Sequence, residues 1–428
     1  MKNVLFIVYY FPPMGGSGVQ RPLKFAKYLR EFGWNPIVLC PEPGVYHTFD
    51  KSLEQDLESL NLEIHRVQDG DIFQKSASSK KSIELDFSDK TAKKLRRISR
   101  LFFYPDNKRG WISPAYEKGL EIVANKKIDL IFSTAPPFSN HLLGQQLKET
   151  TGIPLVVDYR DSWTRNHFQE DMWSWQKQIL RNQERRVVAT ADKIICLDEF
   201  IKNDFVEDYP ELENRLEVIP HGFDSEDFNE SDLHSKFQYK KGALNFLYSG
   251  LFYEQNQPDS FLESMYQLFS TKPALKEKVH LHFQGTVDKR IKSLIENLGL
   301  SENVTDYGYL PHRIAAKNLL DADVLWMISN FHPELKQIKS GKLFEYFGSR
   351  KPIMALVHES EASKLLEAYE AGFWANPLSV IEIKNRLELL IELWEANILP
   401  KPNNEFVAQF ERKSLTQKLV KIFNVISS

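Results

Sequence analysis

The residues best suited to chemistry stand together in one stretch, ELKQIKSGKLFEYFGSRKPIMAL, at positions 334–356. Within it, Ser340 and Gly341 open a predicted helix and leave backbone N–H groups available to an anion. Lys339 and Lys342 place two cations beside those groups, and cationic donors suit phosphate oxygens. The stretch therefore indicates a phosphate site at the start of a helix.

The same helix carries a carboxylate, Glu345, one turn after its start. A carboxylate can accept two hydrogen bonds from vicinal hydroxyls, such as those of a ribose. A diphosphate at the helix start and a ribose at Glu345 would together form a nucleotide site. The alternative is an ordinary helix–strand unit with a capping serine and an incidental glutamate.

A second candidate anion site is the glycine turn FPPMGGSGVQR, which follows an apolar run near the N-terminus. Gly15, Gly16 and Ser17 let the backbone approach a ligand closely, and the next helix adds oriented N–H donors. The dinucleotide fingerprint requires a further glycine three residues after Gly18, where this chain has Arg21. The turn therefore does not predict a nicotinamide cofactor. Arg21 favours an anion, and a packing turn without a ligand is the alternative.

Length and composition are those of a globular chain. Its 428 residues favour two domains, and its net charge of −3 predicts no general attraction to nucleic acid. No apolar run reaches the roughly 20 residues that span a bilayer, and the N-terminus has no signal-peptide cleavage pattern. Cys40 and Cys196 each end an apolar run, which suits buried thiols in a reducing compartment. We expect a cytoplasmic protein, and no spacing of residues predicts a metal site.

Short apolar runs alternate with helical patterns, which predicts parallel sheets covered by helices on both faces. The predicted strands of the first half are Val4–Tyr9, Pro36–Leu39, Leu130–Ser133, Leu155–Asp158 and Ile194–Leu197. Those of the second half are Leu244–Ser249, Val279–Gln284, Val304–Tyr307, Val324–Ile328 and Ile353–Val357. We expect two doubly wound, Rossmann-like α/β domains, residues 1–212 and 213–408, with a last helix within 412–428 packed back on the first. Because such sheets bind ligands at the carboxyl ends of their strands, the domains are expected to face each other across a cleft.

One basic region departs from this alternation. Residues 75–109 hold eleven lysines and arginines against four acidic residues. Residues 88–103 form a predicted amphipathic helix whose apolar face comprises Ala92, Leu95, Ile98 and Phe102. A basic amphipathic helix is typical of a contact with an anionic membrane surface. A solvated helix that packs on its own domain is the alternative.

Taken in order, the motifs resemble those of the GT-B glycosyltransferases, specifically the retaining transferases of glycosyltransferase family 4. FPPMGGSGVQR resembles their N-terminal glycine loop, VIPHGFD their interdomain turn, and LNFLYSG the strand that opens their donor domain. IDLIFSTAPPFSNHLLGQQLKETTGIPLVVDYRDSW resembles a block of bacterial polysaccharide transferases, and SGKLFEYFGSRKPIMAL the region of the second glutamate of the E-x7-E motif. The resemblance implies a GT-B fold without a bound metal or cofactor, in which the nucleotide sugar is a substrate held by the C-terminal domain.

The resemblance also assigns residues to roles. Lys342 would stabilise the departing diphosphate. The implied donor-binding residues are Gly250, Tyr309, Leu310, Gln337, Lys339, Ser340, Gly341 and Glu345. The candidates for the acceptor side or the cleft are Gly15, Gly16, Ser17, Arg21, His141 and His221, with Trp163 as a further one.

Three positions depart from the family pattern. Gln337 stands where the first glutamate of E-x7-E is expected, with Glu334 nearby. The Arg and Lys expected after the glycine of the donor strand are absent, so Lys339 and Lys342 are the candidates to replace them. The histidine expected after the fourth strand of the first domain is also absent. In its place, within DYRDSW, Arg160 and Asp161 are the catalytic candidates.

The leading interpretation is a hexosyltransferase that uses a UDP-type nucleotide sugar and retains the anomeric configuration. Its acceptor would be a saccharide or a lipid-linked saccharide in surface polysaccharide biosynthesis. Two alternatives are a sugar-nucleotide epimerase of the same architecture and a non-catalytic glycosyltransferase-like subunit. The first would isomerise the donor without an acceptor, and the second would bind no donor.

Overall fold

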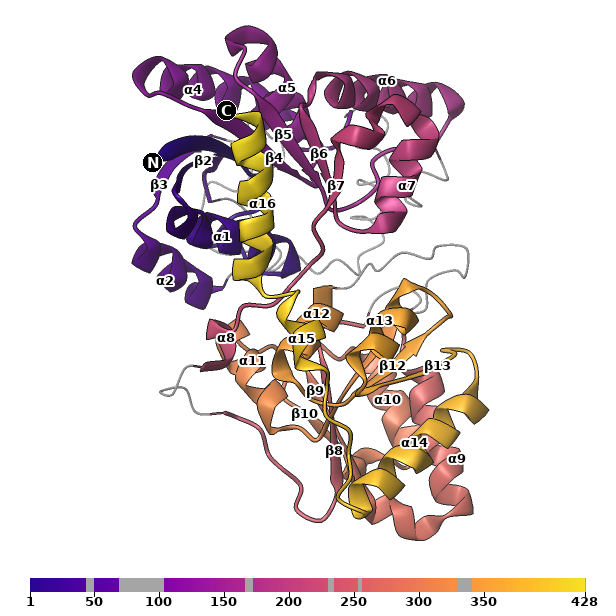
Figure 1. The fold of residues 1–428 in the computed structure, drawn as a ribbon. Coiled ribbons are helices and arrows are strands. Elements are labelled where there is room, and N and C mark those ends of the chain that lie inside the picture. The colour runs from indigo at the N-terminus through magenta and orange to yellow at the C-terminus, as the bar shows by residue number, and fades with distance from the viewer. Residues whose placement is uncertain are drawn as a thin grey trace. The chain divides into compact units, whose positions relative to one another are not determined.

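The computed structural model describes residues 1–43, 50–68, 104–165, 172–229, 235–252, 256–329 and 341–427. The chain divides into two units. Unit 1 comprises Met1–Pro220 and Leu415–Ser428, and unit 2 comprises His221–Ser414. Each unit is built on one parallel sheet with helices on both faces (Figure 1).

The sheet of unit 1 has seven described strands in the order β3-β2-β1-β4-β5-β6-β7. They are β1 (Lys2–Ile7), β2 (Trp34–Pro41), β3 (Glu63–Val67), β4 (Leu130–Ala135), β5 (Leu155–Tyr159), β6 (Lys193–Cys196) and β7 (Leu216–Val218). Central strands are continuous apolar runs because both of their faces are covered. In β1, Leu5 and Ile7 join one buried cluster, whereas Val4 and Phe6 join the cluster on the opposite face.

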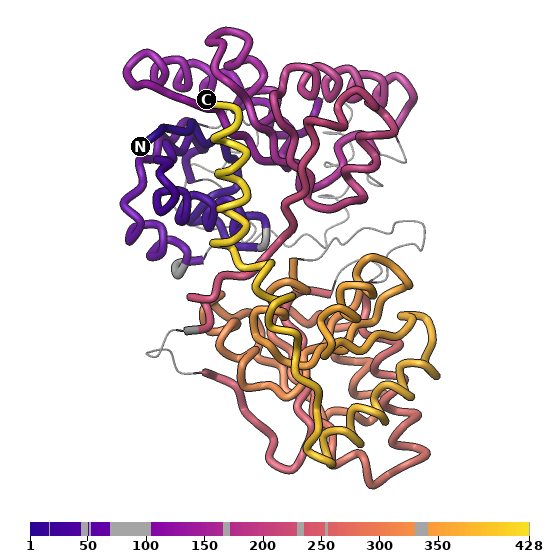
Figure 2. Tube along the Cα trace, in the orientation of Figure 1, coloured from indigo at the N-terminus to yellow at the C-terminus, as the bar shows by residue number. Residues whose placement is uncertain are grey.

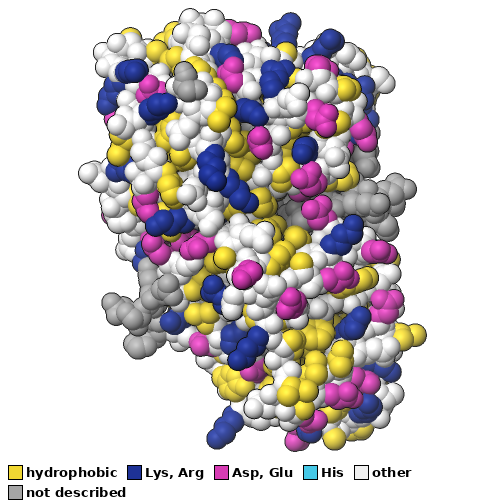
Figure 3. Space-filling view, viewed as in Figure 1, with side chains coloured by type: hydrophobic (Ala, Val, Ile, Leu, Met, Phe, Trp, Pro, Cys, Tyr) yellow, Lys and Arg dark blue, Asp and Glu magenta, His cyan; other side chains and the backbone are white. Residues whose placement is uncertain are grey.

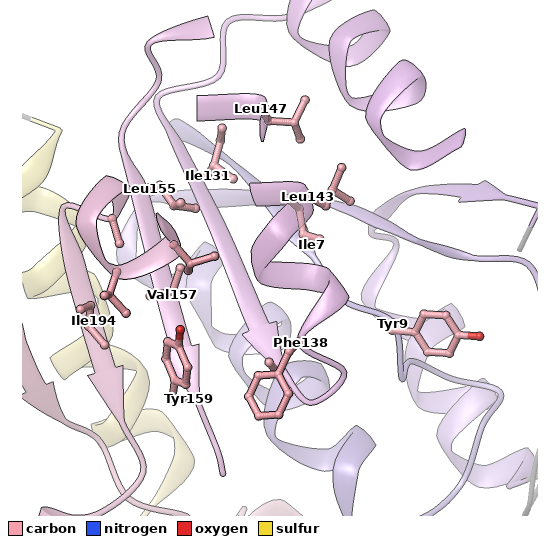
Figure 4. Packing of buried hydrophobic residues seen from close by; sticks show 14 of the residues in the cluster. Ile7, Tyr9, Ile131, Phe138, Leu143, Leu147, Leu155, Val157, Tyr159 and Ile194 are labelled. Carbon is pink, nitrogen blue, oxygen red and sulfur yellow. The ribbon is translucent and has the colours of Figure 1, made fainter. Parts of the chain in front are cut away.

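Helices cover both clusters of unit 1. On the side of Leu5 lie α4 (Ile112–Asn125), α5 (Ser139–Thr151), α6 (Ser174–Thr190) and α7 (Glu199–Asp208). Figure 4 shows this cluster, with Leu143 and Leu147 of α5 close to Ile131 of β4. On the other side lie α1 (Ser17–Leu29), α2 (Lys51–Leu60) and α16 (Arg412–Ile426).

The last helix, α16, returns the chain to unit 1, as the yellow end of the trace in Figure 2 shows. Its Leu415, Leu419 and Phe423 are buried in the cluster that α1 covers. The indole Nε1 of Trp34 donates a hydrogen bond to Asn424 Oδ1 at 3.0 Å. The C-terminal helix is therefore part of the core of unit 1.

The sheet of unit 2 has six described strands in the order β10-β9-β8-β11-β12-β13. They are β8 (Leu244–Ser249), β9 (Val279–Gln284), β10 (Val304–Asp306), β11 (Val324–Ser329), β12 (Ile353–Val357) and β13 (Gly372–Ala375). One face is covered by α9 (Asp259–Thr271), α10 (Lys289–Asn297) and α14 (Val380–Glu395). The other is covered by α8 (Glu226–Asn229), α11 (His312–Asp321), α12 (Gly341–Ser349), α13 (Glu361–Tyr369) and α15 (Asn404–Ala408).

These two sheets confirm the expected α/β class and all ten predicted strands. Three described strands, β3, β7 and β13, are not predicted from the sequence. β7 has only three residues, and β3 and β13 are edge strands that are mostly half-buried. Such strands lack the long apolar run that marks the buried centre of a parallel sheet. On the face seen in Figure 3, basic and acidic side chains are interspersed over both units, in keeping with the small net charge.

Candidate functional site

The helices that follow β8 and β11 leave the sheet of unit 2 on opposite faces. α9 follows β8 and covers one buried cluster, whereas α12 follows β11 and covers the other. β8 and β11 are neighbours in the sheet. Such a topological switch leaves a crevice at the carboxyl ends of the strands, which is where open α/β sheets bind ligands. We call the residues around it the switch-point site, namely Tyr248, Gly250, Gly341, Lys342 and Glu345.

The cation of the switch-point site is Lys342, the second residue of α12. Its Nζ lies 3.7 Å from the centroid of the Tyr248 ring. Burial lowers the pKa of Lys342 to about 7, and Glu345 opposes that shift. The amine is thus held close to the point where it changes charge at neutral pH. The positive end of the helix dipole disfavours the ammonium, whereas an anion bound there would favour it.

Gly250 is the residue that makes room for this lysine. Its φ is 125°, and a Cβ added to it would lie 3.0 Å from Lys342 Nζ. Gly285, at the end of β9, also has a φ of 125°, and its Cβ would lie 2.1 Å from the carbonyl oxygen of Gly250. Side chains at either position would push into the backbone or the lysine, so both glycines are required for the close approach of the strand ends.

The carboxylate of the site, Glu345, belongs to a cluster of charges from several helices. Its Oε1 lies 3.7 Å from His312 Nδ1 on α11. The other ring nitrogen, His312 Nε2, lies 3.3 Å from Asp227 Oδ2 on α8. Burial raises the pKa of Glu345 and Asp227 adds to this, whereas His312, Lys342 and Arg412 lower it. Its half-buried carboxylate remains an acceptor that a ligand can reach.

The structure describes some of the other residues predicted for the donor, and also His221, which is predicted for the acceptor side or the cleft. The ring of His221 packs near Gly341, whose added Cβ would lie 3.7 Å from His221 Cδ2. Tyr309 follows β10 and is 52% exposed, and Leu310 beside it is half-buried. Gln337, Lys339 and Ser340 lie outside the described residues, so their predicted roles stay predictions.

In unit 1, the glycine turn and DYRDSW are joined by two arginines. The Arg21 guanidinium is buried and donates to both carboxylate oxygens of Asp158, at 3.1 and 2.7 Å. It also donates to the carbonyls of Ile219 and Pro220 at 2.9 and 2.7 Å. Arg21 therefore does not meet an external anion, which corrects the expectation from the sequence.

Arg160, within DYRDSW, bonds to the glycine turn. It donates to the carbonyl of Gly18 at 2.6 Å, and to those of Ala135 and Pro136 at 3.1 and 2.6 Å. With its three guanidinium nitrogens committed and its side chain buried, Arg160 holds the turn in place. Its predicted catalytic role is therefore corrected to a structural one. Its neighbour Asp161 is half-buried and stays a prediction.

The remaining residues predicted for the acceptor side divide into accessible and buried ones. Gly16 is exposed with a φ of 101°, Gly15 is buried, and the side chain of Ser17 is not among those described. His141 is buried, with Nδ1 2.8 Å from Ser133 Oγ, and burial lowers its pKa to about 3. His141 thus lies in the core and does not line a ligand site, contrary to expectation.

Trp163 lies in the core as well. It is buried and stacks on Phe138, with centroids 4.8 Å apart. Figure 4 places Phe138 beside Tyr159 in this cluster. The further acceptor role suggested for Trp163 is therefore corrected to core packing.

Sequence reasoning missed Tyr248 and His312. Tyr248 is the tyrosine of LNFLYSG, directly before the strand end, and its aromatic type at that place is the available signal. His312 follows GYLP and gives no signal of its own, because its partners Asp227 and Glu345 are distant in sequence. The described part of the chain contains no cluster of His, Cys, Asp and Glu that could hold a metal ion. None of its helices combines the length and apolarity needed to cross a bilayer.

Comparison with known proteins shows what this chain is similar to. Residues 19–227 match the model of Glycosyltransferase Family 4. No curated protein matches the sequence of this chain. A glycosyltransferase from Rickettsia africae is similar in structure, with a TM-score of 0.65 at 14% identity over 99% of this chain and 98% of that chain.

Two further structures have the same architecture. Anabaena HepE in complex with UDP has a TM-score of 0.63 at 13% identity, over 99% of this chain and 100% of that chain. WaaG, a glycosyltransferase involved in lipopolysaccharide biosynthesis, has a TM-score of 0.58 at 16% identity, over 99% of both chains. Both units thus have the parallel-sheet, Rossmann-like folds of GT-B glycosyltransferases, and the N-terminal unit carries the match to glycosyltransferase family 4.

Proposed function

We propose that this chain is a glycosyltransferase that moves a hexose from a nucleotide sugar to a saccharide or a lipid-linked saccharide. The observation that carries the proposal is the switch-point site. It combines a cation, a carboxylate and a helix start at the ligand-binding edge of a GT-B unit. The family match over residues 19–227 supports transfer over other uses of a nucleotide site.

Each part of the switch-point site suits one part of a nucleotide sugar. Lys342 and the N–H groups at the start of α12 would meet the diphosphate, whose negative charge grows as the sugar leaves. Glu345 would accept hydrogen bonds from the ribose diol. Tyr309, exposed after β10, would border the base. A UDP-type donor is supported by HepE, whose structure contains UDP.

Unit 1 would bind the acceptor, and the reaction would retain the anomeric configuration. The acceptor hydroxyl would attack the anomeric carbon on the face of the leaving group. The new C–O bond would form as the bond to the β-phosphate oxygen breaks, and the hydroxyl proton would pass to a diphosphate oxygen. A role in surface polysaccharide synthesis is supported by the described role of WaaG in lipopolysaccharide biosynthesis.

Thermal unfolding with a panel of UDP-, GDP- and ADP-sugars tests the donor site. One UDP-sugar should raise the midpoint, because a ligand of the native state stabilises it by mass action. Glu345→Ala should weaken that donor by about 1.5–3 kcal/mol, roughly 10- to 150-fold in Kd, because it removes a charged acceptor. Glu392→Ala, an exposed glutamate on α14, is the matched control and should leave Kd unchanged.

The outcomes separate the three functions considered. Transfer of labelled sugar to an acceptor supports the proposal, and an isomerised donor without acceptor would replace it with an epimerase. If no nucleotide sugar shifts the midpoint, the result would favour a non-catalytic subunit. Unchanged Kd in Glu345→Ala would remove that residue from the donor site.

We also propose that unit 1 touches an anionic membrane surface through residues 88–103. That segment lies outside the described residues, but the point where the described chain resumes supports the proposal. Tyr104 packs edge-on against Trp175, with centroids 6.2 Å apart, and accepts a hydrogen bond from Gln176. Trp173 and Trp175 are 67% and 50% exposed there, and exposed tryptophans are typical of a membrane interface.

Anionic liposomes at low salt should therefore bind the wild-type chain, and added salt should release it. Each basic residue near the surface contributes about 1 kcal/mol, so changing Lys93, Lys94, Arg96 and Arg97 to Glu should abolish binding. Sedimentation with vesicles measures this, with neutral vesicles and donor binding as controls. A wild-type chain that ignores anionic vesicles at low salt would instead favour a soluble acceptor.

A further inference from the structure

The ammonium of Lys342 lies on an aromatic ring. Its Nζ is 3.7 Å from the centroid of Tyr248, a distance at which the ring face attracts a cation. Tyr248 itself is fixed, because it is buried and stacks on Phe252 with centroids 4.0 Å apart. Its hydroxyl donates to the carbonyl of Leu251 at 2.9 Å. The ring is thus a rigid platform at the carboxyl end of β8.

The attraction of the Tyr248 ring for the ammonium offsets only part of the hydration free energy that Lys342 loses on burial. Burial lowers the pKa of Lys342 to about 7 despite the nearby Glu345 on the same helix. The other charged groups around Glu345 are His312 on α11, Asp227 on α8 and Arg412 on α16. The free site therefore holds Lys342 only partly protonated at neutral pH.

We propose that Tyr248 is a positioning residue for Lys342, and that a nucleoside diphosphate binds this site with proton uptake by Lys342. This inference rests on the proposed function, because it assigns the diphosphate to the switch-point site. Gly250 permits the arrangement by leaving open the space that a Cβ would occupy 3.0 Å from Nζ. Tyr248 and Gly250 both lie outside SGKLFEYFGSRKPIMAL, the stretch that resembles the family motif around Glu345.

The direction of the pH dependence follows from the charge balance. Solvent supplies the proton, the amine becomes an ammonium, and the ammonium then pairs with phosphate oxygens. Bound diphosphate therefore raises the pKa of Lys342 above its value in the free site. Affinity is full below the pKa of the free site and falls as pH rises through it.

Calorimetric titration of UDP into the full chain measures the effect in two buffers with different ionisation enthalpies. With a pKa of about 7 in the free site, we expect uptake of about half a proton at pH 7 and about nine-tenths at pH 8. We also expect Kd to rise roughly 50-fold between pH 7 and pH 9. Lys342→Arg is the matched variant, and its guanidinium, charged throughout, should bind UDP with no such uptake.

The aromatic platform is tested by two substitutions of Tyr248. Tyr248→Phe keeps the ring face and should keep the proton uptake and the pH profile. Tyr248→Leu removes the ring face that attracts the ammonium, so the pKa of Lys342 in the free site should fall further and Kd should begin to rise at a lower pH than in the wild type. A wild-type profile in folded Tyr248→Leu would overturn the role of the ring.

The remaining outcomes separate this inference from the proposed function. UDP binding without proton uptake, or with the same uptake in Lys342→Arg, overturns the inference and leaves a donor site elsewhere around α12. A wild-type chain that binds neither UDP nor any nucleotide sugar overturns both. Thermal unfolding of each variant shows whether it is folded, and Lys342→Arg remains informative where Tyr248→Leu is not folded.

Discussion

Asp158→Ala should lower the free energy of unfolding of unit 1 by about 3–5 kcal/mol, because it leaves a buried guanidinium without its counter-ion. Arg21 and Asp158 are both fully buried, and two hydrogen bonds join them. Thr134 Oγ1 donates a third bond to the carboxylate at 2.7 Å. Denaturant unfolding measures the loss, and hydrogen exchange at β1, β4 and β5 assigns it to unit 1.

Two controls test this explanation. Replacing both partners, in Arg21→Met with Asp158→Leu, should recover much of the loss, because neither charge of this pair is then left buried without the other. Glu121→Ala breaks an exposed pair with Lys118 and should cost at most about 1 kcal/mol. A loss in Asp158→Ala no larger than that of Glu121→Ala would contradict the role of the buried pair.

The pH dependence of this contribution has a definite sign. Burial alone would raise the pKa of Asp158, but Arg21 and its other partners lower it overall. The contribution is therefore present above the pKa of an unfolded aspartate, near 4, and is lost as pH falls through the lower value of the folded chain. Acid unfolding of unit 1 should accordingly begin below about pH 4.

Arg21 and Arg160 show why the role of the glycine turn could not be predicted from its local sequence alone. Its glycines and the arginine that follows are equally compatible with an anion site and with a packed turn. The difference lies in Asp158 and in the Ile219 and Pro220 carbonyls, which are more than 130 residues away in sequence. Local sequence carries no information on such a partner, so the prediction for Arg21 was wrong.

The fold itself could be predicted because its signal is local. A strand covered on both faces is a continuous apolar run, and the runs alternate with helical patterns through both units. The start of α12 was predictable for the same reason, since a glycine, a lysine and a glutamate follow one another along it. The aromatic platform was not, because Tyr248 and Lys342 meet only after β8 and α12 are assembled.

Lys342→Ala should lower kcat by about 10²–10³-fold, the loss typical of one preorganised group that meets charge developing in a transition state. The affinity for the donor at pH 7 should also fall, by about 50-fold, the change expected in the wild type when the amine loses its proton at pH 9, because the variant lacks the ammonium while the helix start still meets the ground-state diphosphate. Steady-state kinetics with the donor identified by the panel, together with Kd from calorimetry, measure both quantities.

Substitutions of two other lysines test whether the loss of kcat is specific to Lys342. Lys364→Ala removes an exposed lysine of α13 and should leave both kcat and Kd unchanged. Lys339→Ala removes the second predicted cation, three residues before Lys342. Its kcat and Kd are to be compared with those of Lys342→Ala. A loss confined to Kd in Lys342→Ala, with kcat intact, would assign this lysine to donor binding alone. The growth of charge on the departing diphosphate would then have to be met by the backbone at the start of α12, since an N–H donor there is unaffected by the substitution.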